Sequence, residues 1–532
     1  MNRRLLPKLG SLWRRSELEL ATPTTTAKHK LGTLWSRIHW IKSWRRSTRA
    51  IFSGAEASKG ASQVLAELHK QQQQQHHHHH EQQQQHQQQP PKEGSVLAVR
   101  IERLSSEGHG VGRCEATDWT VMVFGALPGE LVRVEIGRNL KHCSQGRLVE
   151  VIEPSESRVE PKCKHFGSCG GCQYQHLAYS AQLEWKRRHV QEALARHVEF
   201  GLPEDLVQPT VASPLQYGYR TKITPHLQLP PAGNAAQHRR RGGSESWVDR
   251  ASSRAGGGSS NYGWGELATG PLGFLEEVAH QRDGSGSWWK RVVDVASCPV
   301  ATEGINAALP AARDHVRRRG GPFEILLRHS SRHGVVFGRK LVVTEEVAGL
   351  GAFSFQAGGF FQNNSSILPA FVRHVVAEAA APWSEGGMAE ERPATLLDVY
   401  CGVGLFALSA SASFRQVIGV EVDAAAVELA CSNAKAHGAE NVAFHAASAE
   451  DGLARLSSEV DSSQTALIVD PPRAGLSKPA LEALLALRPR RLVYVSCEVT
   501  NLARDLRQIL DAGYSLASVT PFDLFPQSRH LE

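Results

Sequence analysis

This sequence has no long apolar run, and that absence excludes an integral membrane protein. In 532 residues no stretch reaches the roughly 18 apolar residues of a membrane-spanning helix, so no membrane is expected among the partners. Nine cysteines are an odd number in a long chain, which does not fit the paired disulfide framework of a small secreted domain. A chain of this length exceeds one compact core, and we expect about two or three domains.

Acidic residues are scarce at the N-terminus. Residues 1–54 hold twelve lysines and arginines but only Glu17 and Glu19, a net charge of +10 against +7 for the whole chain. The rest of the chain is therefore slightly acidic, and its contacts with nucleic acid have to come from local basic patches. A basic, acid-poor leader is typical of a transit peptide, which predicts a chloroplast or mitochondrion over the cytoplasm or nucleus. A disordered arm that contacts RNA is the alternative.

Low-complexity segments interrupt the chain at two places. Residues 71–89 consist almost entirely of glutamine and histidine and cannot bury a core, so residues 55–95 are expected to be a disordered linker. Residues 229–260 form an insertion rich in proline, glycine and serine that also holds five arginines. We expect a flexible loop there, either a tolerated insertion or a segment that contacts RNA.

Three further regions carry periodic patterns. Residues 96–155 alternate apolar and polar side chains between glycine turns, which predicts a small β-barrel. Residues 156–365 combine a cysteine-rich loop, a helical stretch at 176–197 and strands within 324–338, and are expected to form a central α+β domain. Residues 366–532 alternate apolar strands with helical patterns, which is typical of a parallel, doubly wound α/β sheet.

The strand ends of that sheet predict a nucleotide-type pocket, because ligands bind beyond the carboxyl ends of parallel strands. Asp398, Tyr400, Gly402 and Gly404 follow the first strand, and glycines let a ligand approach the backbone closely. Glu421 ends the second strand, where a carboxylate can accept hydrogen bonds from a ribose diol. The turn lacks the third glycine of a dinucleotide fingerprint, which favours S-adenosylmethionine over NAD. A tight strand–helix connection is the alternative.

Cys497 follows the last apolar strand and faces the same predicted crevice as Asp470. A buried structural cysteine is the commoner fate of such a residue, but its position favours covalent chemistry. Uracil C5 is a weak nucleophile until a thiolate adds to C6, and a base must then remove the C5 proton. Cys497 is therefore the candidate nucleophile, and Glu532 the candidate base.

Four cysteines form a candidate metal site. Cys163, Cys169 and Cys172 are spaced C-x5-C-x2-C, and Cys298 is the candidate fourth ligand. Four thiolates suit either Zn²⁺ or a [4Fe–4S] cluster. The spacing is not the paired CxxC of a zinc ribbon, nor the CxxxCxxC of a radical enzyme. A structural or RNA-positioning role is therefore expected rather than a chemical one.

Taken together, residues 96–532 resemble the RNA uracil-C5 (m5U) methyltransferase family, which includes 23S rRNA and tRNA enzymes with a TRAM domain and an iron–sulfur cluster. Besides the barrel, the resemblance is carried by C-x5-C-x2-C at 163–172, Y-G-Y-R-T-K at 217–222, F-F-Q-N-N at 360–364, D-V-Y-C-G-V-G-L-F at 398–406, V-E-V-D at 420–423, D-P-P-R-A-G at 470–475, S-C at 496–497 and F-P-Q-S-R-H-L-E at 525–532. It implies a class I Rossmann-like methyltransferase domain behind a TRAM-like (OB) barrel.

The resemblance also implies roles for particular residues. Cys497 would be the nucleophile and Glu532 the general base. S-adenosylmethionine would contact Gln362, Tyr400, Glu421, Asp470 and, by a weaker match, Ser448, and a [4Fe–4S] cluster would bind Cys163, Cys169, Cys172 and Cys298. The implied function is methylation of uridine C5 in structured RNA by a monomer, with rRNA favoured over tRNA because the cluster-containing subset includes rRNA enzymes. The target uridine would be flipped out of its stack, and Arg220 and Lys222 would contact the RNA backbone.

Three departures from the family pattern favour a second hypothesis, a catalytically impaired factor that binds or folds RNA. Glu498-Val499 replaces the usual Asn-Pro, and a carboxylate beside Cys497 is expected to raise its pKa. Leu405 replaces a commonly polar turn residue. The family continues beyond the base with a further strand, so we expect a truncated C-terminus here and a frayed Glu532. A small-molecule or protein methyltransferase is a third hypothesis, which the barrel and Cys497 disfavour.

Overall fold

The computed structural model describes residues 90–114, 117–197, 203, 205–227, 271–277, 281–282, 288–289, 291–319, 324–383 and 391–532. The chain divides into two units, Met1–Gln88 and Gln89–Glu532, and every described residue belongs to the second unit. The predicted transit peptide, most of the predicted linker and the insertion 229–260 lie outside the described residues. They remain predictions, as does the organelle. No helix in the described ranges combines the length and apolarity needed to cross a membrane.

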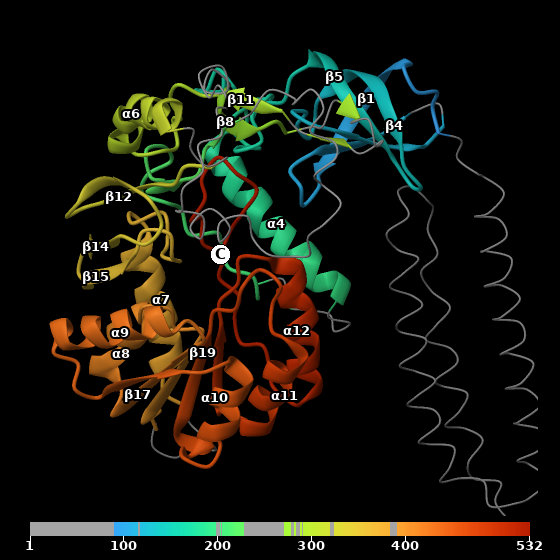
Figure 1. Ribbon diagram of the computed structural model, residues 1–532. Helices are drawn as coiled ribbons and strands as arrows, with labels where there is room; N and C mark the ends of the chain where they lie inside the picture. The colour runs from blue at the N-terminus through green and yellow to red at the C-terminus, as the bar shows by residue number, and fades with distance from the viewer. Residues whose placement is uncertain are drawn as a thin grey trace, which may run out of the picture. The chain divides into compact units, whose positions relative to one another are not determined.

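The first described region is a closed five-stranded β-barrel, drawn in blue in Figure 1. Its strands are β1 (Val96–Leu104), β2 (Gly110–Cys114), β3 (Thr120–Val123), β4 (Leu131–Asn139) and β5 (Ser144–Glu153). The alternating apolar side chains that the sequence shows point inward and form the barrel core. Gly112 permits closure, because a Cβ at that position would overlap the backbone of Arg100 on β1.

The barrel begins before Val96, which corrects one boundary of the predicted linker. The backbone N–H of Gly94 donates to the carbonyl of Ile136 over 2.7 Å, and the Asn139 side chain donates to the carbonyl of Pro91 over 3.0 Å. These long-range bonds order residues 90–95. The linker prediction failed here because it rested on composition alone, which contains no information about partners on β4.

In the described residues of the central region, small sheets accompany the helices α4 (Tyr179–His197) and α6 (Glu303–Arg319). One sheet has the order β11-β8-β7 and another β13-β12-β6, and β9 pairs with β10. Their bounds are β6 (Lys222–Ile223), β7 (His226–Leu227), β8 (Leu272–Leu275), β9 (Gln281–Arg282), β10 (Trp288–Trp289), β11 (Val292–Asp294), β12 (Leu327–Ser330) and β13 (Gly334–Phe337). This arrangement is the α+β region that the sequence predicted.

A β-hairpin of β14 (Val342–Val347) and β15 (Gly351–Gln356) follows and shares its core with the C-terminal domain. Phe353 and Phe355 are fully buried in the same cluster as Phe371 and Phe406. Residues 357–367 then lead into α7 (Leu368–Ala380), and this connection carries Gln362.

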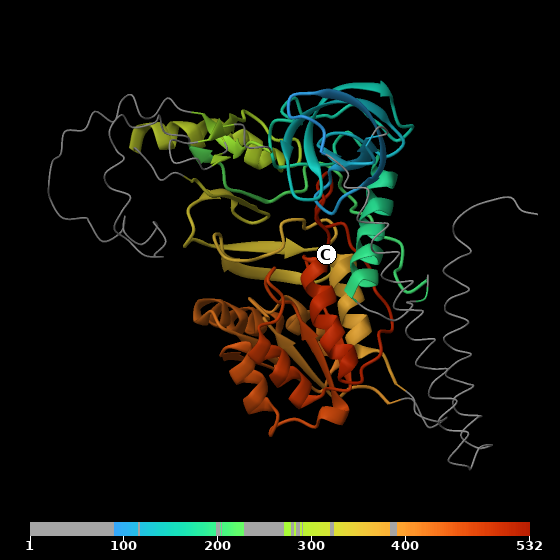
Figure 2. The same ribbon diagram turned by 90° about the vertical axis from the view of Figure 1, so that its right-hand side faces the viewer.

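The C-terminal domain is a parallel five-stranded sheet in the order β18-β17-β16-β19-β20. Its strands are β16 (Thr395–Val399), β17 (Gln416–Glu421), β18 (Val442–Ala446), β19 (Thr465–Val469) and β20 (Arg491–Tyr494). On one face lie α7, α8 (Leu405–Ala410) and α9 (Ala424–His437), and on the other α10 (Ala449–Leu456), α11 (Lys478–Leu487) and α12 (Val499–Asp511). The two layers flank the sheet in Figures 1 and 2.

Side-chain alternation along the central strands builds both layers. Leu396 and Ile468 pack into one cluster, and their neighbours Leu397 and Leu467 pack into the other. This confirms the α/β class predicted from the apolar strand pattern. The sequence analysis missed β18 and α10, because β18 is a half-exposed edge strand and α10 is only eight residues long.

The end of the chain packs against a segment far away in sequence. Val519 and Phe522 form parallel bridges with Val207 and Val211, which lie just beyond α4. The helices α4 and α12 are also in contact. The C-terminal residues therefore join the sheet domain to the central region.

Candidate active site

The strand order reverses between β16 and β19, and in such a sheet a ligand is expected to bind in a crevice beyond the carboxyl ends of these two strands. Tyr400, Gly402 and Gly404 follow β16, and all three have positive φ, of 67°, 54° and 88°. At Gly404, a Cβ would collide with the ring of Phe444, whereas at Gly402 it would meet nothing within 4 Å. Gly402 therefore presents open backbone at the crevice, as close approach of a ligand requires.

Glu421 holds this turn in place. Its carboxylate accepts hydrogen bonds from the backbone N–H groups of Gly402, at 3.1 Å, and Asp423, at 2.9 Å. A carboxylate has about four acceptor sites, so Glu421 keeps capacity to accept from a ribose diol. Gly402 and Glu421 are 19 residues apart in the sequence, and their hydrogen bond joins the turn to the end of β17.

Asp398 is a buried acid that the sequence placed at this strand end but did not assign to the cofactor. One oxygen, Oδ2, accepts from the Ala407 N–H at 2.9 Å, while Oδ1 has no hydrogen-bond partner among the described residues. Burial, and then the charges of Asp470 and Glu421, raise the pKa of Asp398 to about 7. A buried oxygen without a hydrogen-bond donor is unusual in a folded protein, and the described residues supply no donor to Oδ1.

Gln362 and Ser448 lie in different parts of the fold. Gln362 is 5% exposed and lies on the connection between β15 and α7. Ser448 instead caps α10, where its hydroxyl accepts from the Asp451 N–H and donates to the Asp451 carboxylate. Its assignment as a cofactor residue remains a prediction from the resemblance.

Cys497, Glu532 and Asp470 lie close enough to perturb one another's ionisation. Burial, and then the charge of Glu532, raise the pKa of Cys497 to about 11, while Arg473 hydrogen-bonds to the thiol and lowers it. Burial raises the pKa of Asp470 to about 7, and burial with the charge of Asp470 raises that of Glu532 well above its usual value. The structure thus brings together the predicted nucleophile and base, and adds Arg473, which sequence reasoning missed although it lies in the D-P-P-R motif.

Glu532 is not frayed, contrary to the expectation for a terminal residue. Its backbone N–H donates to the carbonyl of Phe522 over 3.0 Å, and its carbonyl accepts from the Phe522 N–H over 2.8 Å. The neighbouring Leu531 is buried. This reciprocal pair fixes the residue, and no sequence pattern signals it because the two partners pair through the backbone.

The structure accommodates the two other residues that depart from the family pattern, Glu498 and Leu405. Glu498 is the N-cap residue of α12, and the largest carboxylate effects on the pKa of Cys497 come from Glu532 and Asp470 rather than from Glu498. Leu405 is buried in the core shared with Phe406 and Phe371. An apolar residue at position 405 therefore fits the packing of α8.

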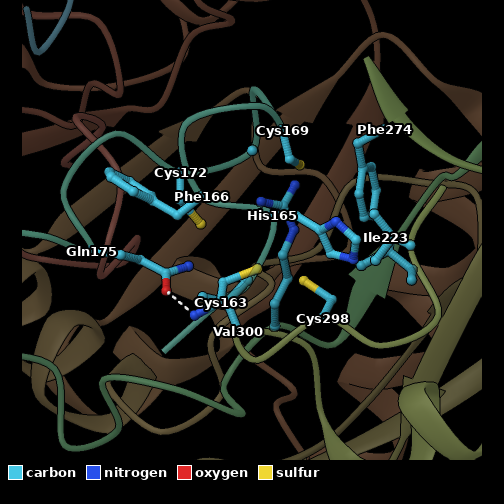
Figure 3. A pocket seen from close by; sticks show the side chains of 13 residues that line it. Cys163, His165, Phe166, Cys169, Cys172, Gln175, Ile223, Phe274, Cys298 and Val300 are labelled. Atoms are coloured by element: carbon cyan, nitrogen blue, oxygen red, sulfur yellow. Dashed lines mark hydrogen bonds between the residues drawn. The ribbon is translucent and has the colours of Figure 1, made fainter. Parts of the chain in front are cut away.

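The four predicted ligand cysteines line one small cavity of about 100 Å³, shown in Figure 3. Cys163, Cys169 and Cys172 come from the loop before α4, and Cys298 comes from the loop between β11 and α6. Side-chain amides hold both loops: Gln175 accepts from the Cys163 N–H at 3.0 Å, and Asn306 accepts from the Cys298 N–H at 2.7 Å. The fold thus brings together residues separated by more than 120 positions.

The identity of the metal at this cavity stays a prediction. Within the described ranges, no group of three or more Cys, His, Asp or Glu side chains is arranged so that it could hold a metal ion. The buried Nε2 of His165, which also lines the cavity, has no hydrogen-bond partner in the described chain.

Burial shifts the ionisation of two of these thiols. Burial, and then the charges of the neighbouring cysteines, raise the pKa of Cys172 to about 12 and that of Cys169 to about 11. Burial raises the pKa of Cys298, and the charge of Arg220, which lines the same cavity, partly opposes that rise. Arg220 therefore faces the thiols, and its neighbour Lys222 lies in β6 with a pKa that burial lowers to about 8.

A larger cavity of about 810 Å³ borders the open edge of β20. Its lining includes Ser496 and Glu532 beside apolar residues of α7 and α12. Tyr400, Gly402 and Gly404 do not line this cavity.

Two parts of this chain match models of known protein families. Residues 353–532 match the model of the tRNA (Uracil-5-)-methyltransferase family, and residues 90–149 match the TRAM domain. A tRNA (uracil(54)-C(5))-methyltransferase of Schizosaccharomyces pombe is 36% identical over 82% of this chain and 77% of its own length. An uncharacterized RNA methyltransferase of Thermosynechococcus vestitus is 33% identical over 83% of this chain and 97% of its own length.

A solved structure has the same fold. It is that of the Pyrococcus abyssi tRNA (uracil-54, C5)-methyltransferase in complex with S-adenosyl-L-homocysteine, which aligns with a TM-score of 0.54. The alignment covers 82% of this chain and 98% of that one, at 21% identity.

Proposed function

Because the chain belongs to the tRNA (uracil-5-)-methyltransferase family and is an RNA uracil-5-methyltransferase, we propose that it methylates C5 of a uridine in tRNA through a covalent bond between Cys497 and C6. S-adenosylmethionine is the methyl donor. The observation that carries the proposal is the electrostatic proximity of Cys497, Glu532 and Asp470 at one end of the sheet.

The relatives favour tRNA over the rRNA expected from the sequence. The S. pombe relative and a second one from Saccharomyces cerevisiae, 30% identical over 82% of this chain, are both named as enzymes of tRNA uracil 54. The preference for rRNA rested on the presence of an iron–sulfur cluster and remains untested. We therefore propose tRNA, and uridine 54 in particular, as the substrate.

Two residues of this site act directly in the proposed reaction, Cys497 as the nucleophile and Glu532 as the base. The Cys497 thiolate adds to C6, and the C5–C6 π electrons move toward O4 as an enolate. C5 then attacks the methyl group, forming a C–C bond while the donor's sulfur–methyl bond breaks. Glu532 removes the C5 proton, the C5–C6 double bond re-forms, and the C6–sulfur bond breaks to release the thiolate.

The charges around Cys497 explain when the thiol becomes reactive. In the protein alone, burial and two carboxylates favour the neutral thiol, and Arg473 opposes them. S-adenosylmethionine, when bound, supplies the methyl group on a positively charged sulfur, a charge that would favour the thiolate and the ionised carboxylates. Open backbone at Gly402, the carboxylate of Glu421 and the side chain of Gln362 are the groups that would hold it.

RNA has to present its uridine unstacked, because C5 and C6 are inaccessible within a helix. We propose that the nucleotide is flipped into the crevice, at a cost of a few kcal/mol, and that the TRAM barrel holds the RNA backbone. We also propose that the chain acts as a monomer.

A trapping experiment tests the function and the substrate together. The full chain is incubated with S-adenosylmethionine and with either a tRNA transcript or an rRNA fragment containing 5-fluorouridine. Fluorine at C5 cannot leave as a proton, so a denaturation-resistant protein–RNA adduct is expected with the tRNA. Omitting the methyl donor is the control for non-specific crosslinking.

Two results would contradict the proposal in different ways. An adduct with the rRNA fragment alone would overturn the substrate class. No adduct with either RNA, despite tight RNA binding, would favour the catalytically impaired RNA-binding factor.

We also propose that Cys163, Cys169, Cys172 and Cys298 bind a [4Fe–4S] cluster. The proposal is supported by four thiols around one cavity, the unpartnered Nε2 of His165 and the nearby charge of Arg220. A cluster at this place would tie the loop before α4 to the loop before α6. Its contribution would be to the structure of the central region.

Metal analysis of one cysteine variant tests the cluster. Protein purified without oxygen is expected to contain about four irons and four sulfides per chain, and Cys172→Ser is expected to lose most of both. Cys143→Ser, on the barrel and outside the cavity, is the matched control and should keep them. One zinc per chain, lost in the same variant, would identify a structural zinc site instead.

A further inference from the structure

Residues Asp523–Glu532, here called the base loop, carry the proposed general base at their end. In the described chain the base loop forms no helix or strand. Its course is therefore set by contacts with other parts of the molecule, and these contacts decide where the Glu532 carboxylate lies. Phe522 fixes only the two ends through its backbone pair with Glu532.

The apex of the base loop is Gln527, which is 2% exposed and has a φ of 68°. Its backbone carbonyl accepts from the N–H groups of Gln173, at 3.1 Å, and Tyr174, at 3.0 Å. Both donors directly follow Cys172. The loop that carries three of the four cysteines therefore holds the apex of the base loop.

Gln182 on α4 forms a reciprocal pair with Gln527. The Gln182 amide Nε2 donates to Gln527 Oε1 over 3.0 Å, and Gln182 Oε1 accepts from the Gln527 backbone N–H over 3.1 Å. The same Nε2 lies within hydrogen-bond distance of the carbonyls of Tyr174 and Leu177. One buried side chain thus connects α4, the end of the cysteine loop and the base loop.

We propose that Gln182 and Gln527 are positioning residues for Glu532. This inference rests on the proposed function and assigns to these two amides the placement of its base. Neither side chain touches the reacting atoms. Their paired hydrogen bonds fix the apex of the base loop, five residues before Glu532, so that the carboxylate reaches the proton on C5.

The proposal makes a prediction that a general structural role does not. Attack by Cys497 and methyl transfer precede the use of the base, so displacing the base leaves both steps intact. Removal of the C5 proton becomes slow, the C5–C6 double bond re-forms late, and the C6–sulfur bond persists. A methylated covalent RNA adduct therefore accumulates on ordinary uridine, for which turnover normally removes it.

The experiment compares Gln182→Ala and Gln527→Gly in the full chain, since alanine suits helix α4 and glycine accepts the positive φ at position 527. Adduct carrying labelled methyl and tritium release from [5-³H]uridine tRNA are measured together. We expect tritium release to slow by about tenfold, adduct to accumulate, and KM for tRNA to stay within about twofold. Glu532→Gln is the reference for a lost base, and Gln508→Ala, exposed on α12, is the matched control.

Several outcomes separate this inference from the proposed function. Wild-type-like turnover in both variants, or an equal loss of adduct formation and tritium release, would overturn it. If the wild type itself forms no adduct with 5-fluorouridine tRNA, the proposed function fails first. Should Gln182→Ala fold poorly, Gln182→Met keeps the volume of the side chain and removes the same hydrogen bonds.

Discussion

Replacing Cys497 by alanine is expected to abolish methyl transfer to RNA and the covalent adduct, with a loss in kcat/KM of at least about a thousandfold. The reason is that C5 of uracil becomes nucleophilic only while sulfur is bonded to C6. Methyl transfer from labelled S-adenosylmethionine to tRNA measures the loss. Binding of S-adenosylmethionine should be nearly unchanged, because the groups assigned to it lie around Gly402 and Gln362.

Cys431→Ala is the matched control, since it removes a half-buried thiol on α9 from the same domain. It should retain activity within about twofold. If Cys497→Ala kept methyl transfer near the wild-type rate, Cys497 would be the buried structural cysteine that the sequence also allowed. The covalent mechanism would then be wrong, although family membership would stand.

Replacing Lys186 by methionine is expected to destabilise the protein by about 3–5 kcal/mol, because it leaves a buried carboxylate without its partner. Lys186 on α4 donates to Asp523 over 2.5 Å and to the carbonyl of Phe525 over 3.1 Å, and both charged side chains are fully buried. Asp523 begins the base loop. Urea unfolding of the full chain, followed by tryptophan fluorescence, measures the change in free energy of unfolding.

The double variant Lys186→Met/Asp523→Leu should recover much of the loss, because neither charge then remains buried. Lys478→Met gives the exposed comparison: Lys478 pairs with Glu482 on the surface of α11, with 85% of its side chain exposed. Its loss should change stability by less than about 0.5 kcal/mol. A similar small effect at Lys186 would mean that the buried pair contributes little to folding.

Much of the fold could be predicted because its signals are local. Alternation along β1 and the apolar runs of β16 and β19 are short-range patterns that tertiary packing preserves. The same holds for part of the site. Parallel strands end at one edge of a sheet, so Gly402, Glu421 and Asp470 could be expected near one another without knowledge of the strand order.

The rest depended on contacts that join distant parts of the chain. Gln182 and Gln527 are 345 positions apart, and Lys186 and Asp523 are 337 apart. No periodicity links such residues, and glutamine or aspartate in a loop usually indicates only a solvated surface. The hydrogen bonds between Phe522 and Glu532 were missed for a similar reason. They join backbone atoms, so they do not depend on which side chains stand at these positions.

Val519 and Phe522 form parallel bridges with Val207 and Val211, and these long-range contacts determine which parts of the protein can fold first during synthesis. All five strands of the barrel lie within residues 96–153, so the barrel can fold while the ribosome is still synthesising the remainder. Cys497 and Glu532 cannot take up their places until residues 519–532 have left the exit tunnel and packed against Val207 and Val211, which are synthesised much earlier. A nascent chain could thus hold RNA long before it could modify it.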